Sequence, residues 1–199
     1  MNKGNEVSLF DYMPKEINKF GYEIKKPKIE LYNDNFQNFK KYGIKKAQLV
    51  IADVPYNLGV NAYASNPMWY ENGDNTKGES KLAGKAFFSS DFNFNIAEYM
   101  HFCSKLLIPE PKEKGKAPAM IVFCAFDQMQ TIIEYGKKYG FKNSYPLFFI
   151  KDYSPQVLKA NMKIVGATEH AVVLYRDKLP KFNNNGQMIF NWMRWKRDD

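Results

Sequence analysis

The chain has 199 residues, of which 45% are hydrophobic and 16% aromatic, so it can bury the core of one domain and its bulk is not intrinsically disordered. Its 29 basic residues outnumber 21 acidic ones, and the resulting net charge of +8 favours a polyanionic partner without proving one. The two cysteines, Cys103 and Cys124, lie in apolar runs without zinc-ligand spacing, so we expect buried free thiols and no metal. No long apolar segment is found near the N-terminus, so we expect a cytoplasmic protein without a membrane span.

The first quarter of the chain predicts an arm, a short strand, a short helix and a buried strand. Residues 1–28 are polar and basic and are interpreted as an N-terminal arm, followed by one domain over 29–199. Residues 28–34 have a short strand pattern, and Asn35 is expected to cap the helix that follows. The run AQLVIAD at 47–53 is apolar on both faces, which predicts a central strand of a covered, parallel sheet.

A long polar segment separates this strand from the first confident helix. Residues 57–90 are rich in Gly and Asn and have no hydrophobic period, so we expect a mobile, functional loop. Residues 95–108 place their apolar positions on one helical stripe, and Asn95 and Glu98 are spaced like a capping box.

The second half of the chain continues the alternation of helix and strand. A helix is expected from a cap at Asp127 to Gly140, after a strand at 119–126. Two further strands are predicted at 145–152 and 169–178. The order of elements indicates an α/β fold with one antiparallel pair near the end.

The strand at 47–53 ends in Asp53, which is followed by Val54, Pro55 and Tyr56. Ligands of open α/β sheets bind beyond the carboxyl ends of strands, so Asp53 is a candidate for chemistry, the alternative being an ordinary turn cap. The pattern suits the exocyclic amine of a nucleobase, because the Asp53 carboxylate and the Val54 carbonyl can accept its two hydrogens. Pro55 restricts the backbone before it, and Tyr56 offers a flat face to an extruded base. Two more residues are expected to shape the turn beneath this pocket: Asn57 and Gly59.

The segment DVPYNLG at 53–59 resembles the Asp-Pro-Pro-Tyr motif of amino-methyltransferases that modify adenine N6 or cytosine N4 in DNA. The surrounding segments, over roughly 28–182, are similar in type and order to the catalytic half of the beta class of these enzymes. The resemblance implies a Rossmann-like methyltransferase fold that uses S-adenosylmethionine (SAM), with a mostly parallel sheet, one antiparallel strand and an incomplete set of elements. It implies a site-specific DNA adenine-N6 methyltransferase of a restriction–modification system.

The resemblance also implies a role for each residue of the motif. Asp53 and the Val54 carbonyl would accept hydrogen bonds from the target amine, Tyr56 would stack on the flipped base, and Asp53 would border the cofactor. Nitrogen would attack the methyl group of SAM directly. Lys151, in the segment KDYSPQ, would lie at the rim of the base pocket or contact a phosphate.

Two departures from the family pattern affect what this chain can do. Val54 replaces the first proline of the motif, which keeps the carbonyl acceptor but removes one backbone constraint. The glycine-rich Phe-x-Gly-x-Gly cofactor motif and the segment resembling His-Pro-Thr-Gln-Lys-Pro are absent from the sequence. The chain is therefore interpreted as part of a longer enzyme, one polypeptide of a split enzyme, or a degenerate remnant. We expect a C-terminal methyltransferase polypeptide or a second copy of the chain as its partner.

Basic residues are concentrated in the last quarter of the chain. Residues 153–197 contain eight basic and two acidic residues, interleaved with aromatic ones. We expect the segment 153–166 and the loop 60–90 to approach double-stranded DNA, with three named contacts: Tyr153, Lys159 and Lys163. A non-catalytic nucleic-acid-binding or specificity subunit is the alternative function, and methylation of RNA or of a protein glutamine stays open.

Overall fold

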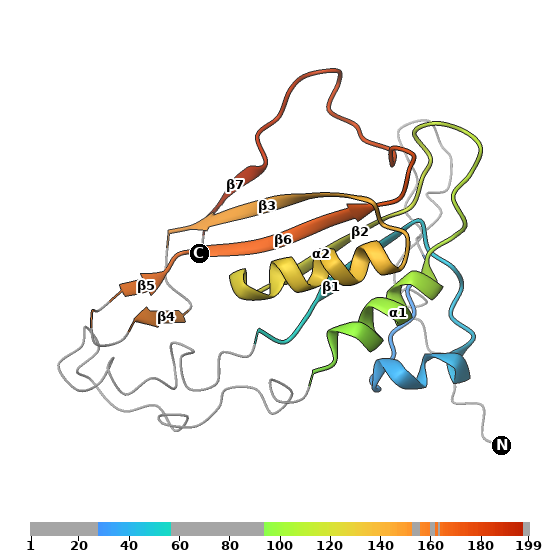
Figure 1. The fold of residues 1–199 in the computed structure, drawn as a ribbon, viewed down its shortest axis with the longest axis horizontal. Helices are drawn as coiled ribbons and strands as arrows, with labels where there is room; N and C mark the ends of the chain where they lie inside the picture. The colour runs from blue at the N-terminus through green and yellow to red at the C-terminus, as the bar shows by residue number, and fades with distance from the viewer. Residues whose placement is uncertain (1–27, 57–93, 153–155, 160–161, 163, 197–199) are drawn as a thin grey trace, which may run out of the picture.

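The structure is a computed structural model, and it describes residues 28–56, 94–152, 156–159, 162 and 164–196 (Figure 1). Apart from residue 28, the expected N-terminal arm lies outside the described residues, and so does the expected loop 57–90. The account of the fold below is an account of the described part of the chain.

The centre of the fold is a five-stranded sheet in the order β1-β2-β6-β3-β7. Its strands are β1 (Leu49–Asp53), β2 (Ala119–Cys124), β3 (Asn143–Lys151), β6 (Thr168–Tyr175) and β7 (Trp192–Trp195). Strand β1 is parallel to β2 and β3 is parallel to β7, whereas β6 is antiparallel to both β2 and β3. Four strands thus run in one direction and β6 in the other, which confirms the α/β fold class with a mostly parallel sheet and one antiparallel strand.

A second, smaller ladder lies outside this sheet. Strands β4 (Gln156–Lys159) and β5 (Ile164–Gly166) pair in antiparallel fashion, with a register shift between Val157 and Lys159. The sequence did not predict this hairpin or the strand β7, because their residues do not form a long apolar run.

The described helices pack on one face of the sheet. They are α1 (Ile96–Leu106), α2 (Met129–Lys138) and the two 3-10 helices η1 (Phe36–Tyr42) and η4 (Phe126–Gln128). Figure 1 shows α1 and α2 side by side against the sheet, and α1, α2 and the strands contribute to the same buried cluster. Residue Gly136 of α2 comes so close to β6 that an added Cβ would lie 3.1 Å from a methyl group of Leu174, so a larger residue there would require the Leu174 side chain to shift.

Helix α1 confirms the prediction made from its hydrophobic stripe. Its buried residues are Met100 and Cys103, and the Asn95 side chain caps it by accepting hydrogen bonds from the backbone N–H groups of Ala97 (3.0 Å) and Glu98 (3.2 Å). Burial raises the pKa of the Cys103 thiol to about 11 and that of Cys124 to about 12. Both thiols are free and buried, as predicted, and stay protonated at neutral pH.

The predictions for the short strand at 28–34 and for the caps of two helices are wrong in detail. Residues 28–34 form no strand, and the helix after Asn35 is a 3-10 helix for which Asn35 supplies no capping bond. The neighbouring Asp34 carboxylate organises this turn by accepting from the Asn35 N–H (2.7 Å) and from Asn38 Nδ2 (2.8 Å). At the second helix start, Asp127 lies within η4, and α2 begins after Gln128 without a side-chain capping bond. The Gln128 side chain instead accepts a hydrogen bond from the Ala125 N–H at the start of η4 (3.0 Å).

The predicted central position of the first strand is also wrong within the described sheet. Strand β1 has β2 as its one neighbour there and forms an edge. Val50 and Ala52 face the helices, whereas Leu49 and Ile51 face the other side and are 45% and 66% exposed. Apolar residues on both faces indicated a covered strand, but the described helices cover only one face.

Candidate active site

Three chain segments meet at one edge of the sheet because β6 runs against its neighbours. Strand β1 ends at Asp53 and β3 ends at Lys151, while the antiparallel β6 begins at Thr168. The start of β6 therefore lies beside the ends of the other strands, and the Lys151 N–H donates to the Ala167 carbonyl at 2.7 Å. This is the edge at which open α/β sheets bind ligands.

Glu169, the second residue of β6, connects two of the predicted site residues. Its carboxylate accepts a hydrogen bond from the Tyr56 hydroxyl at 3.0 Å and forms an ion pair with the Lys151 ammonium group. The side chains of Lys151 and Glu169 are 8% and 19% exposed, so this pair is largely shielded from water. The structure thus connects Lys151 to Tyr56 of the motif through Glu169, a residue that the sequence analysis missed, and the role expected for Lys151 stays a prediction.

The signal for Glu169 was present in the sequence but could not be interpreted without the sheet. An acidic residue at the start of the apolar strand 169–178 has no partner that sequence spacing can identify. Tyr56 and Glu169 are 113 residues apart, and only the antiparallel insertion of β6 brings them together.

The ionisation of Asp53 and Tyr56 is set by their shared environment. Partial burial raises the pKa of the Asp53 carboxyl, and the negative charge of Glu169 adds to this, while a hydrogen bond with Tyr56 and the charge of Lys151 oppose it. Burial and the two nearby carboxylates raise the pKa of Tyr56 far above its usual value. The Tyr56 hydroxyl therefore stays protonated and acts as a hydrogen-bond donor, which fixes its ring at this edge.

The backbone of the motif is held from both sides. The Val54 side chain is buried, and its N–H donates to the Phe123 carbonyl at 3.2 Å. The Pro55 carbonyl accepts from Gln128 Nε2 at 2.8 Å, and Gln128 Oε1 accepts from the Ala125 N–H at 3.0 Å. None of the described residues donates a hydrogen bond to the Val54 carbonyl, which follows the Asp53 carboxylate in a residue that is only 3% exposed.

An aromatic wall adjoins these polar groups on the same face of the sheet. The ring of Phe149 lies 5.1 Å from that of Phe123 and 5.2 Å from that of Trp195. The Lys151 ammonium group lies 5.3 Å from the centroid of the Trp195 ring. In the strand register Phe123 lies opposite Asp53, and Phe149 lies opposite Glu169. The edge thus combines acceptors, a buried ion pair and flat apolar surfaces.

The other predicted site residues are not placed by the structure. Asn57, Gly59, Tyr153 and Lys163 lie outside the described residues, and Lys159 lies in β4, where its side chain is not described. Among the described residues there is no cluster of three or more His, Cys, Asp or Glu side chains that could hold a metal ion. Within the same residues, no helix has both the length and the apolar character needed to cross a membrane.

No known protein family and no curated protein matches this chain. Several solved structures are similar to it in fold, among them two of M1.HpyAVI. A crystal structure of the M1.HpyAVI–SAM complex has a TM-score of 0.45 and 17% identity, covering 78% of this chain and 56% of that chain. A crystal structure of M1.HpyAVI has a TM-score of 0.47 and 15% identity, covering 80% of this chain and 61% of that chain. The chain thus spans less than two thirds of the length of either solved chain.

Replacing Gln128 by leucine should lower the free energy of unfolding by about 2 kcal/mol or more, since each buried backbone group left unsatisfied costs roughly 1–3 kcal/mol. The Pro55 carbonyl and the Ala125 N–H would both lose their partner. Urea denaturation followed by circular dichroism measures the change. Gln130→Leu is the matched control, because Gln130 is exposed and bonds only Glu134 on the same helix. Equal effects of the two substitutions would contradict this role of Gln128.

Replacing Asp53 by asparagine should raise the melting temperature at pH 7. A carboxyl whose pKa is raised by folding binds its proton more tightly in the folded state, so its contribution to stability falls as pH rises above its ordinary pKa of 3.8. Asparagine lacks this penalty. The gain over wild type should therefore be larger at pH 7 than at pH 4, which lies near that ordinary value. Scanning calorimetry at both pH values tests this, and a variant less stable than wild type at pH 7 would show that the Asp53 charge is net stabilising.

Proposed function

We propose that this chain is the part of a methyltransferase that binds the target base, and that the enzyme transfers a methyl group from SAM to the N6 amino group of adenine in DNA. The observation that carries the proposal is the arrangement at the end of β1. The partly buried Asp53 carboxylate and the Val54 carbonyl, to which no described residue donates, lie beside a tyrosine ring that is fixed by its hydroxyl. The two solved structures agree with this in fold, and one of them is a SAM complex.

The chemistry needs two acceptors on one amine. The lone pair of an exocyclic amine is delocalised into the base, and hydrogen bonds from its two hydrogens to Asp53 and Val54 draw the nitrogen toward a tetrahedral, nucleophilic geometry. Tyr56 offers its ring to the extruded base, a contact worth roughly 1–3 kcal/mol, which offsets part of the few kcal/mol of unstacking. The raised pKa of Asp53 suits a group that accepts hydrogen bonds from an amine that becomes positively charged and then loses a proton.

The described residues fit only part of a SAM site. When bound, SAM supplies an electrophilic methyl group. Asp53 would border it, but the described residues contain no glycine-rich loop after a strand that would let the backbone approach the cofactor closely. In the described sheet β1 is an edge strand, and Leu49 and Ile51 on its outer face are exposed. Both features support the proposal that a further polypeptide packs against β1. We infer that a C-terminal methyltransferase polypeptide or a second copy of the chain completes the pocket.

Asp53→Ala should abolish methyl transfer from labelled SAM to double-stranded DNA. The assay uses the chain alone and the chain with a polypeptide that carries the glycine-rich cofactor motif, and digestion of the product to nucleosides identifies the methylated base. Asp177→Ala is the matched control, since Asp177 follows the opposite end of β6 and pairs with Lys142 at the surface. Methylcytosine in the digest would contradict the adenine assignment. DNA binding that Asp53→Ala leaves unchanged, with no transfer under either condition, would favour the non-catalytic binding subunit.

Tyr56→Ala should lower transfer more than Tyr56→Phe. The alanine variant loses the ring and with it roughly 5- to 150-fold in rate, the equivalent of roughly 1–3 kcal/mol of stacking. The phenylalanine variant keeps the ring and loses the hydrogen bonds of the hydroxyl to Glu169 and Asp53. Fluorescence of 2-aminopurine at the target position reports extrusion of the base, and it should increase on binding to wild type and to Tyr56→Phe. Equal losses in both variants would show that the hydroxyl, and not the ring, matters.

A further inference from the structure

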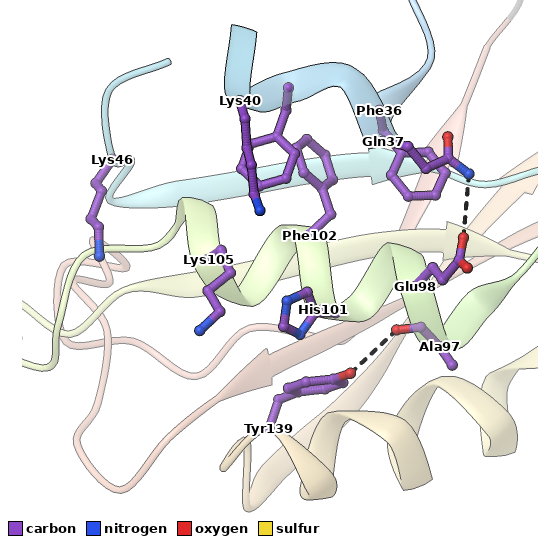
Figure 2. Close-up of a pocket in the computed structure, with 11 residues that line it drawn as sticks. Phe36, Gln37, Lys40, Lys46, Ala97, Glu98, His101, Phe102, Lys105 and Tyr139 are labelled. Carbon is purple, nitrogen blue, oxygen red and sulfur yellow. Dashed lines mark hydrogen bonds between the residues drawn. The ribbon is translucent and has the colours of Figure 1, made fainter. Parts of the chain in front are cut away.

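An open groove lies between η1 and α1, on the helix side of the molecule. It has a volume of about 710 Å³, within the range of small-molecule sites. Figure 2 shows the side chains that line it. None of its lining residues belongs to the edge formed by Asp53, Tyr56, Lys151 and Glu169, so the proposed methyl transfer does not use it.

Three lysines from different segments of the chain lie at one side of this groove. The Ala47 N–H donates to the Leu106 carbonyl at 2.7 Å, which ties the segment before β1 to the end of α1. This tie brings Lys46 and Lys105 to the groove from two directions, and Lys40 reaches it from η1. Figure 2 shows these three ammonium groups on one side, away from the pair formed by Gln37 and Glu98.

The three lysines, Lys40, Lys46 and Lys105, form no ion pair within the part of the chain that the structure describes. The one acidic residue of the lining, Glu98, accepts a hydrogen bond from Gln37 Nε2 at 3.3 Å at the other end. A ligand with a negative group would therefore meet three donors and no repelling charge at the lysine side.

Aromatic side chains form the floor of the groove. Phe102 packs against Phe39 with ring centroids 4.9 Å apart and against Phe36 at 5.5 Å. These rings are only half-buried, so part of their surface faces the groove. On the opposite wall His101 lies 5.6 Å from Tyr139, whose hydroxyl reaches the Ala97 carbonyl. A flat ring can be placed against these surfaces.

We propose that this groove binds a nucleotide, with its phosphate at the three lysines and its base against the aromatic floor. An acidic peptide would use the charges but gain nothing from the rings, so the combination favours a phosphate joined to a flat base. The lysine side lies beside the start of β1, and six residues separate Lys46 from Asp53, a span of about 20 Å in extended chain. The groove is thus a second nucleotide site, and its occupant is either a free nucleotide or one unit of a single strand.

Equilibrium titration of the full chain distinguishes these sources and does not depend on methyl transfer. The probes are adenosine 5′-monophosphate, adenosine, inorganic phosphate, an eight-residue single-stranded oligothymidylate and polyglutamate. The mononucleotide and the oligonucleotide should both bind, and adenosine and phosphate should each bind at least about tenfold more weakly than the mononucleotide. Oligonucleotide affinity more than about tenfold above that of the mononucleotide would assign the site to a strand, and similar affinities would assign it to a free nucleotide.

The double charge reversal Lys40→Glu with Lys105→Glu should weaken binding of both nucleotide probes by more than about tenfold. The milder pair Lys40→Gln with Lys105→Gln should lower the salt slope of oligonucleotide binding by roughly 0.7 for each lysine. All of these side chains are exposed, so folding should persist, and circular dichroism checks it. Lys114→Glu is the matched control at another exposed lysine and should change affinity less than about twofold. No binding of either nucleotide, equal effects of the control, or tighter binding of polyglutamate would overturn the proposal.

Discussion

The Glu169 carboxylate holds the candidate active site together. One of its oxygens accepts from the Tyr56 hydroxyl and the other pairs with Lys151, so one side chain connects the segment after β1 to the end of β3. Loss of Glu169 would remove the counter-ion of the largely buried Lys151 ammonium group, which is strongly destabilising. The orientation of the tyrosine ring and the burial of the lysine therefore depend on the same negative charge.

Val54, which replaces a proline of the family motif, is explained by the hydrogen bond that its backbone N–H donates. A proline at position 54 would stiffen the chain but lacks an N–H group. Val54 uses its N–H to bond the Phe123 carbonyl and buries its side chain, which holds the peptide against β2 instead. Gln128 holds the next carbonyl, that of Pro55. Hydrogen bonds to a neighbouring strand and turn thus hold the backbone on both sides of the Val54–Pro55 peptide.

Sequence patterns predicted what local periodicity and strand ends determine. The stripe and cap of α1, the apolar strands β2 and β6, and Asp53 at the end of β1 were found in this way. Glu169 and Gln128 were not, because their roles depend on partners 113 and 73 residues away. The exposed face of β1 was missed for a related reason: apolar residues on both faces show what a strand can bury, whereas only the fold shows which helices are present to cover it.

The long sequence separation between Tyr56 and Glu169 has a consequence for how this protein acquires its site during synthesis. Contacts between residues far apart in the sequence form slowly, because the entropy of closing the long loop between them must be overcome first. A nascent chain that has emerged only as far as α2 can pack its two helices on β1 and β2, but it has no β6 to insert. The contact between Tyr56 and Glu169 can form only after β6 has entered the sheet between β2 and β3. A chain that binds its ligand at this site has therefore already folded β6 into the sheet.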